Sequence, residues 1–153
     1  MKKAHFTHSE KYISKVIEIE SLVSIFEANY DGAYYFPGEF HPFWELVYVM
    51  KGEVCVSGDE KVYTLRAGEM IFHKPMEFHR LWSANGKEFH VFITAFRAGG
   101  PLTGAFENLA LSLSKGQKSE IERLRSFVRR HFPNKNGNYH TAIFREWNER
   151  RSE

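Results

Sequence analysis

The sequence has almost no cysteine and no long hydrophobic run. Cys55 is the only cysteine among 153 residues, which excludes an internal disulfide and a multi-cysteine zinc site and favours a reducing compartment. The chain begins MKKAHFTHSEKYISKVIEIE, where two lysines follow Met1 without an apolar run behind them. This pattern predicts neither a signal peptide nor a transmembrane helix. We therefore expect a cytoplasmic protein with no membrane contact.

An excess of charge of one sign is also missing. The 21 Lys and Arg residues nearly balance the 19 Asp and Glu residues, and the formal net charge is +2. A dedicated nucleic-acid binder carries a concentrated basic surface that attracts the phosphate backbone. We therefore expect no DNA contact from this chain. Its length is sufficient for one hydrophobic core and short for two, which predicts one compact domain.

Aromatic residues, in contrast, are abundant. They make up 16% of the chain, with fourteen Phe and seven Tyr, and such residues fit half-buried β-strands well. From Ile19 to about Ala98 the sequence reads as short strands separated by Gly, Asp, Asn and Pro, the pattern of a sandwich or barrel. We expect one hairpin over KG at 51–52 and a second over SGDEK at 57–61.

The pattern changes after GGP at 99–101. The stretch KGQKSEIERLRSFVRRHF predicts a helix with Ser114 or Ser119 as its N-cap. Its apolar residues form one predicted stripe: Ile121, Leu124, Phe127 and Val128. A helix of this kind is expected to pack on the barrel.

A second helix is predicted over YHTAIFREWNERRSE, with three apolar residues on one side: Ile143, Phe144 and Trp147. A helix that displays Phe and Trp so close to the end of the chain indicates either a fragment of a longer polypeptide or a stripe that packs on a partner.

The candidate site lies in EFHPFWELVYVMKG, residues 39–52. Alternate residues of a strand face the same way, so Glu39, His41 and Glu45 are expected to line one surface near one end of a strand. A barrel could bring His79, from HKPMEFHRLW, beside them. Imidazole and carboxylate groups together suit a divalent transition metal such as Zn, Ni, Fe or Mn.

The residues leave three interpretations of this group open. It is a metal site, a pocket for a polar effector without a required metal, or a structural hydrogen-bond network, because buried polar groups need partners in any case. We interpret His73 and His90 as loop or structural histidines. Trp44 and Tyr48 could wall a ligand pocket, since sugars stack on aromatic faces, or could simply pack in the core.

Two motifs carry a resemblance to a known family. The usual first cupin motif has His-x-His, three residues, Glu, six residues and Gly, matched here by Glu39, His41, Glu45 and Gly52. The second motif is matched by a glycine, a proline and a histidine: Gly68, Pro75 and His79. Glu39 replaces the first histidine, no glycine follows the proline, and the final Asn is out of register. HPFWELVYVMKGE and GEMIFHKPMEFHRL resemble, more narrowly, the N-terminal effector-binding domain of AraC-family transcriptional regulators.

This resemblance implies a mainly β fold, a cupin-like jelly-roll barrel followed by C-terminal helices. Residues 1–100 would form the effector-binding barrel with an N-terminal arm, and residues 101–153 the connector and helices. It implies a small-molecule effector, such as a sugar or related metabolite, and a homodimer. The effector would be held by six residues: Glu39, His41, Glu45, His79, Trp44 and Tyr48. DNA would be bound only through a helix-turn-helix module that this chain lacks, and no residue would be catalytic.

Two other classes of function remain open. The first is a small metal-dependent cupin enzyme, a dioxygenase or isomerase, in which His41, Glu45 and His79 hold the ion and Glu39 is a fourth ligand or a base. The second is a binding module that acts alone, against which the apolar C-terminal stripe argues.

Overall fold

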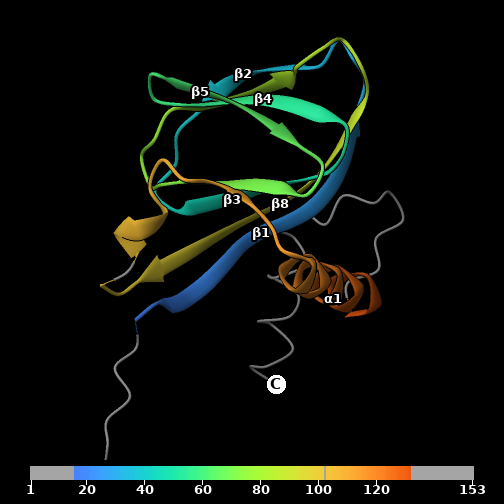
Figure 1. Ribbon diagram of the computed structural model, residues 1–153. Helices are drawn as coiled ribbons and strands as arrows, with labels where there is room; N and C mark the ends of the chain where they lie inside the picture. Colours follow the sequence, from blue (N-terminus) through green and yellow to red (C-terminus); the bar gives the residue numbers. More distant parts are fainter. Residues whose placement is uncertain (1–15, 102, 132–153) are drawn as a thin grey trace, which may run out of the picture.

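Two β-sheets face each other and one helix covers the outer side of the larger sheet (Figure 1). The structure is a computed structural model that describes residues 16–101 and 103–131. The five-stranded sheet has the order β1–β8–β3–β6–β9 and the four-stranded sheet has the order β2–β7–β4–β5. The elements are β1 (Glu18–Tyr30), β2 (Tyr35–Glu39), β3 (Trp44–Lys51), β4 (Glu53–Gly58), β5 (Lys61–Arg66), β6 (Glu69–His73), β7 (His79–Ser83), β8 (Phe89–Gly99), η1 (Thr103–Phe106), β9 (Ala110–Ser112) and α1 (Lys115–His131).

The expected fold class, a mainly β jelly-roll barrel followed by C-terminal helices, is confirmed by the two-sheet architecture and by the one α-helix of the described residues. All pairs of adjacent strands are antiparallel. Strand β9 lies in the region expected to be a connector, yet it pairs with β6 and extends the larger sheet. Within the described ranges, no helix is long and apolar enough to span a membrane.

The larger sheet is covered on both faces, which explains the nearly continuous apolar run of β3. Val47 and Val49 belong to a cluster enclosed between the two sheets. Leu46 and Tyr48 belong to a second cluster, which Val128 of α1 joins. Because successive side chains of a strand point to opposite faces, one strand contributes to both clusters.

The first expected hairpin is wrong, and Gly52 shows why. Strand β3 pairs with β6 and β8, whereas β4 pairs with β5 and β7, so the chain crosses from one sheet to the other at this turn. Gly52 has φ of 81°, and a Cβ there would lie 2.7 Å from the carbonyl oxygen of Glu88. A glycine is therefore required for close packing at a crossover. The second hairpin is confirmed, with Gly58 paired to Lys61.

Helix α1 begins with the predicted cap. The backbone N–H of Gln117 donates to Ser114 Oγ at 3.3 Å, and the backbone N–H of Ser114 donates to Gln117 Oε1 at 2.9 Å. These reciprocal bonds form a capping box, which satisfies two N–H groups at the start of the helix.

The predicted apolar stripe of α1 is only partly buried. Val128 is buried and Ile121 packs against the same cluster, but Leu124 and Phe127 are 39% and 53% exposed. Arg125 lies on the buried side instead. The second predicted helix, with Ile143, Phe144 and Trp147, lies outside the described residues.

Arg125 joins α1 to the sheet through Glu27 of β1. Its Nε and Nη2 donate to the two carboxylate oxygens at 2.9 Å, and Arg129 Nη2 adds a third bond at 2.8 Å. Burial opposes ionisation of Glu27, but the bonds from Arg125 and Arg129 outweigh it and hold the pKa of this carboxyl below its usual value. At pH values above the unfolded-state pKa of Glu27, its ionised carboxylate therefore stabilises the fold. This stabilisation is lost as the pH falls through the lowered pKa of Glu27 in the folded state.

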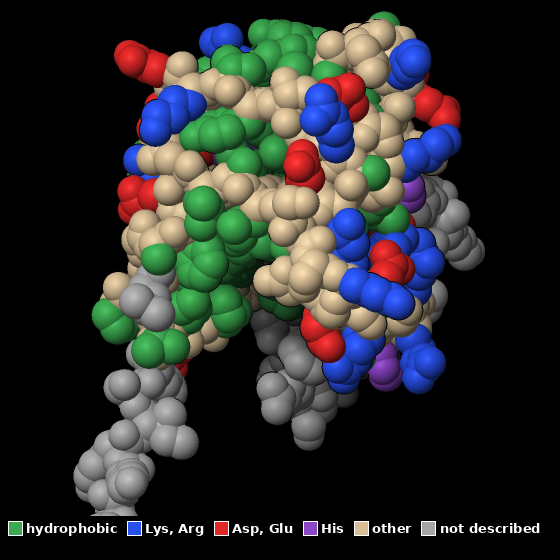
Figure 2. All heavy atoms as spheres, in the orientation of Figure 1, with side chains coloured by type: hydrophobic (Ala, Val, Ile, Leu, Met, Phe, Trp, Pro, Cys, Tyr) green, Lys and Arg blue, Asp and Glu red, His purple; other side chains and the backbone are tan. Residues whose placement is uncertain are grey.

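The tip of the larger sheet carries an apolar surface. Figure 2 shows hydrophobic side chains gathered between the free ends of the sheet strands and α1. An apolar pocket of about 200 Å³ lies there, lined in part by Trp44, Phe72, Phe96 and Phe106.

We expect Arg125→Met to destabilise the domain by about 2–4 kcal/mol, because it leaves the poorly solvated carboxylate of Glu27 with fewer partners. The matched control is Arg123→Met, since Arg123 is exposed and pairs with Glu120 on the same helix. That change should cost less than about 0.5 kcal/mol. Urea unfolding measures both, and equal losses would contradict the buried role of Arg125.

We expect Met76→Gly to stabilise the domain by about 0.5–1 kcal/mol. Met76 lies in the loop between β6 and β7 with φ of 63°, a left-handed conformation that glycine adopts freely, and its side chain is 59% exposed. Met76→Ala is the control, because it removes the side chain but keeps the Cβ that causes the strain. A gain in thermal midpoint for alanine equal to that for glycine would refute this explanation.

Candidate functional site

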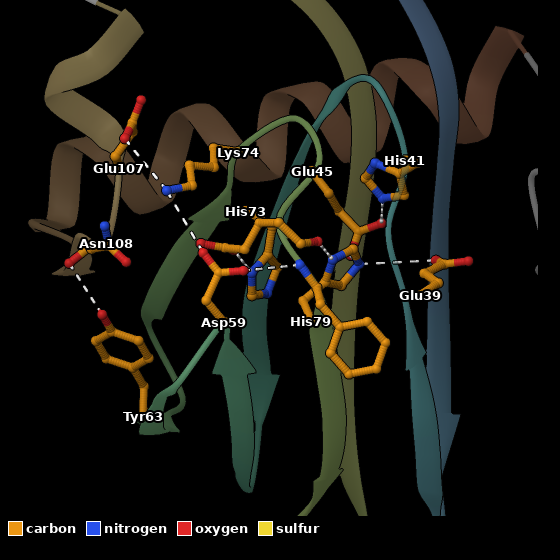
Figure 3. Close-up of polar contacts among 12 residues, drawn as sticks. Glu39, His41, Glu45, Asp59, Tyr63, His73, Lys74, His79, Glu107 and Asn108 are labelled. Atoms are coloured by element: carbon orange, nitrogen blue, oxygen red, sulfur yellow. Dashed lines mark hydrogen bonds and ion pairs between the residues drawn. The ribbon is translucent and has the colours of Figure 1, made fainter.

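Four side chains from different elements meet at one end of the barrel (Figure 3). Glu39 ends β2, His79 begins β7, Glu45 lies on β3, and His41 lies in the connection between β2 and β3. One ligand atom from each lies within 4.8 Å of those of the other three. The structure thus brings together the four residues that the sequence grouped, although Glu39 and Glu45 belong to opposite sheets rather than to one strand.

Glu45 lies between the two histidines. Its Oε2 is 3.5 Å from His41 Nε2 and its Oε1 is 3.6 Å from His79 Nε2. Glu39 Oε1 is 3.9 Å from His79 Nε2, across the β2–β7 pairing that sets Glu39 opposite His79. Each carboxylate is therefore close to an imidazole, and Glu45 is close to both.

The second nitrogen of each ring is held by a backbone carbonyl. His41 Nδ1 is 3.0 Å from the Phe43 oxygen, and His79 Nδ1 is 3.0 Å from the Glu77 oxygen. A carbonyl only accepts hydrogen bonds, so in the neutral rings Nδ1 carries the proton and Nε2 carries the lone pair. Both Nε2 atoms are buried and lack a hydrogen-bond partner.

This donor set fits a divalent transition metal. Two imidazole lone pairs and two carboxylates converge, and the second ring nitrogens make the carbonyl contacts typical of metal-bound histidine. The partnerless Nε2 atoms support the same assignment, since buried polar atoms are normally satisfied. Glu39, His41, Glu45 and His79 could therefore hold Zn, Ni, Fe or Mn.

The electrostatics of the two histidines differ. Burial opposes protonation of His41, but the nearby Glu45 carboxylate outweighs it and raises the pKa of His41. Deeper burial dominates for His79 and lowers its pKa, despite the attraction of Glu45. His79 is therefore the more readily neutral of the two and the stronger candidate for a permanent lone-pair donor.

A pocket of about 140 Å³ opens from this cluster into the barrel. Its polar end includes Glu39, Glu45, His73, His79 and Arg80. Its other walls are apolar and aromatic: Phe26, Tyr30, Tyr34, Phe36, Val47, Leu81 and Ile93. A cavity with few polar groups at one end and apolar walls has the usual composition of a small-molecule site.

Sequence reasoning missed the aromatic walls. The Tyr30 and Tyr34 rings stack with centroids 3.7 Å apart, and burial together with Tyr34 raises the pKa of Tyr30. The available signal was the alternation of apolar residues in SIFEANY, which places Phe26, Ala28 and Tyr30 on one face of β1.

Trp44 and Tyr48 do not line this pocket. They lie on the outer face of β3, because the strand period of two that directs Glu45 and Val47 inwards directs both aromatics outwards. Trp44 borders the apolar pocket at the sheet tip, and Tyr48 packs in the cluster beneath α1. The aromatic residues that line the pocket are Phe26, Tyr30, Tyr34 and Phe36 instead.

His73 and His90 occupy different places. His73 ends β6, is buried, and hydrogen-bonds Glu77 Oε2 through Nδ1 at 2.6 Å. Of the two expected places, loop or structural, its position in β6 and its buried hydrogen bond agree with the structural one, and it also lines the pocket. His90 lies 3.6 Å from Glu27 in the network at the outer face of the larger sheet.

Comparisons with known proteins identify one matching family. A family model described as the AraC-like ligand binding domain matches residues 22–118, which include all four donors. A comparison with curated proteins gives no match.

Several solved structures are similar to this chain. One is a conserved protein of unknown function from Streptococcus pyogenes, with 16% identity and a TM-score of 0.45 over 48% of this chain and 62% of that one, so the match spans less than two thirds of its length. A cupin 2 conserved barrel domain protein from Rhodopseudomonas palustris has 18% identity and a TM-score of 0.42 over 66% of each chain. A cupin-2 domain containing protein from Shewanella frigidimarina has 20% identity and a TM-score of 0.42 over 52% of this chain and 83% of that one.

Proposed function

The chain belongs to the family of AraC-like ligand-binding domains, and from this premise we propose that it is the effector-sensing and dimerisation domain of a bacterial AraC-family transcription regulator. One observation supports this most strongly. The matched region contains a barrel pocket whose polar end includes Glu39, Glu45 and His79, three of the four side chains of the cluster. DNA binding would belong to a separate helix-turn-helix module.

The effector that fits this pocket is small, polar at one end and apolar or flat at the other. The carboxylate oxygens of Glu39 and Glu45 are hydrogen-bond acceptors, and the neutral Nε2 atom of His79 adds another. His41 belongs to the same cluster but does not line the pocket. Tyr34 and Phe36 offer faces on which a sugar ring or a similar metabolite stacks. A ligand rich in hydroxyl donors satisfies these acceptors.

A bound metal would be held by the same four donors. It would supply a Lewis-acidic centre that binds an oxygen of the effector. Glu45 contributes most to such a site because its two oxygens face both imidazoles, and it would neutralise part of the charge of the ion.

Strand β1 offers a route from the pocket to the helix. Phe26 lines the pocket, while the next residue, Glu27, binds Arg125 and Arg129 of α1 on the opposite face. A shift of Phe26 on effector binding would therefore move Glu27 and its hydrogen bonds to Arg125 and Arg129 of α1. For this shift to regulate dimerisation and DNA binding, the protein must have two positions of α1, and the effector must bind the two forms with different affinities.

A small metal-dependent cupin enzyme is the second candidate, favoured by the partnerless Nε2 atoms of His41 and His79. In this alternative the two histidines and Glu45 hold the ion, and the more exposed Glu39 is a fourth ligand or a base. Turnover of a substrate by the metal-loaded domain would select this alternative over a sensor.

We expect the purified protein to bind close to one equivalent of a divalent transition metal, and the double change His41→Ala with His79→Ala to abolish it. Elemental mass spectrometry and calorimetric titration with Zn²⁺ measure this. His131→Ala is the matched control, because His131 lies at the exposed end of α1 and should leave binding unchanged. Equal metal content in the double variant and in His131→Ala would rule out this metal centre. If the wild type binds no metal, the group is interpreted as an effector pocket that works without one.

We expect Glu39→Gln to weaken effector binding about tenfold, because a charged acceptor at the pocket mouth is replaced by a neutral one. A thermal-shift screen of sugars and small acids identifies the effector, and calorimetry compares the variants. Glu60→Gln, in the exposed turn between β4 and β5, is the control. The regulatory proposal fails if a bound effector changes neither dimerisation nor, in the full-length protein, DNA affinity.

A further inference from the structure

Glu77 is a buried carboxylate that the proposed site does not use. It lies in the loop between β6 and β7, with 3% of its surface exposed. Its Oε2 accepts a hydrogen bond from Nδ1 of His73, which is 1% exposed, at 2.6 Å. Removing both groups from water is costly, and an apolar pair of the same size would fill this space without that cost.

The fold makes room for this carboxylate. Gly58, at the end of β4, has no positive φ, so its backbone does not require glycine. A Cβ at this position, however, would lie 2.8 Å from the Glu77 carboxyl carbon and from Oε2. The absence of a side chain at position 58 therefore serves to accommodate Glu77.

Glu77 also holds His79 through its backbone. Its carbonyl oxygen accepts from His79 Nδ1 at 3.0 Å, and the His73 ring stacks on the His79 ring with centroids 4.4 Å apart and planes at 15°. One residue thus contacts both imidazoles, with its side chain on His73 and its carbonyl on His79.

The same loop reaches His41. The backbone N–H of Met76 donates to the His41 carbonyl at 2.8 Å, and the N–H of Asp59 donates to the Phe78 carbonyl at 2.8 Å. The loop is therefore anchored on both sides of the cluster, and the Glu77 carboxylate is its anchor to the barrel interior.

His79 has two competing tautomers in this setting. With the proton on Nδ1 it donates to the Glu77 carbonyl, and with the proton on Nε2 it would instead face Glu45 Oε1 at 3.6 Å. In the second form the proton occupies Nε2, so the Nε2 lone pair that the site needs is no longer available. The position of the Glu77 carbonyl decides between them.

We propose that Glu77 and His73 are positioning residues that hold His79 in the tautomer with the proton on Nδ1, so that its Nε2 lone pair faces Glu45, Glu39 and His41. The use of this lone pair rests on the proposed function; the tautomer itself does not.

The test is long-range proton–nitrogen NMR of the metal-free protein at about pH 8, where unperturbed imidazoles are neutral. Wild-type His79 should show the Nδ1–H pattern, assigned by its loss in His79→Gln. Glu77→Ala should shift His79 towards the Nε2–H pattern. Glu77→Gln is the matched control and should preserve Nδ1–H, because its side-chain oxygen still accepts from His73.

Gly58→Ala places a Cβ against the Glu77 carboxylate and displaces it, so this variant should also shift the tautomer of His79. It keeps the test available if Glu77→Ala fails to fold. Wild-type His79 in the Nε2–H form, or an unchanged Nδ1–H form in a folded Glu77→Ala or Gly58→Ala variant, overturns the proposal.

A titration with Zn²⁺ separates this proposal from the proposed function. The expected result is a loss of affinity of about 10–100-fold in Glu77→Ala, with Glu77→Gln within about threefold of wild type. If the tautomer shifts as expected but the wild type binds neither metal nor effector, the proposed function fails and the positioning role stands. If Zn²⁺ binds equally to all three proteins and the tautomer is unchanged, the positioning role fails and the site stands.

Discussion

The approach of Glu45 to His79 across the barrel mouth is the contact on which the rest of the site depends. Glu45 comes from the five-stranded sheet and His79 from the four-stranded sheet, and their side chains lie 3.6 Å apart. This proximity requires that the two sheets close at this end, which the apolar cluster between them drives. The site is thus a product of the barrel core rather than of one local segment.

The two faces of the larger sheet contact different parts of the structure. Its inner face carries Glu45 and the pocket wall formed by Phe26, and its outer face carries Glu27 and the apolar cluster under α1. Because these residues alternate along the same strands, the pocket and the helix are separated by the thickness of one sheet. The proposed effector would therefore lie closer to α1 than the length of the connecting chain suggests.

The sequence predicted the barrel from local strand and turn signals, and it grouped Glu39, His41, Glu45 and His79 through the spacing of the cupin-like motifs. The strand period assumed for this group did not hold, because Glu39 lies on β2 and Glu45 on β3 of the opposite sheet. Strand-length apolar runs, turn residues and the spacing of Glu39, His41 and Glu45 all appear within a few residues. Gly52 marked a turn correctly, but a turn residue carries no information about which sheet the next strand joins. The false hairpin between β3 and β4 follows from that limit.

The aromatic walls and Glu77 escaped prediction for a different reason. Whether Tyr48 faces the pocket depends on which side of β3 meets the opposite sheet, and residues on both sides of β3 join apolar clusters. Tyr34 lies in the connection between β1 and β2, where no strand period indicates its direction. Burial of Glu77 depends on the missing side chain of Gly58, nineteen positions earlier in the chain. Contacts of this kind exist only after the sheets are assembled.

The placement of the donors on opposite sheets has a mechanical consequence. Any species bound by Glu39, His41, Glu45 and His79 together would link the two sheets at the open end of the barrel. Motions that separate the sheets there would first have to break the bonds to the bound species, so binding would oppose opening of the barrel at this end. Binding of such a species would therefore stabilise the closed barrel, because a ligand that binds only the folded, closed form raises its stability.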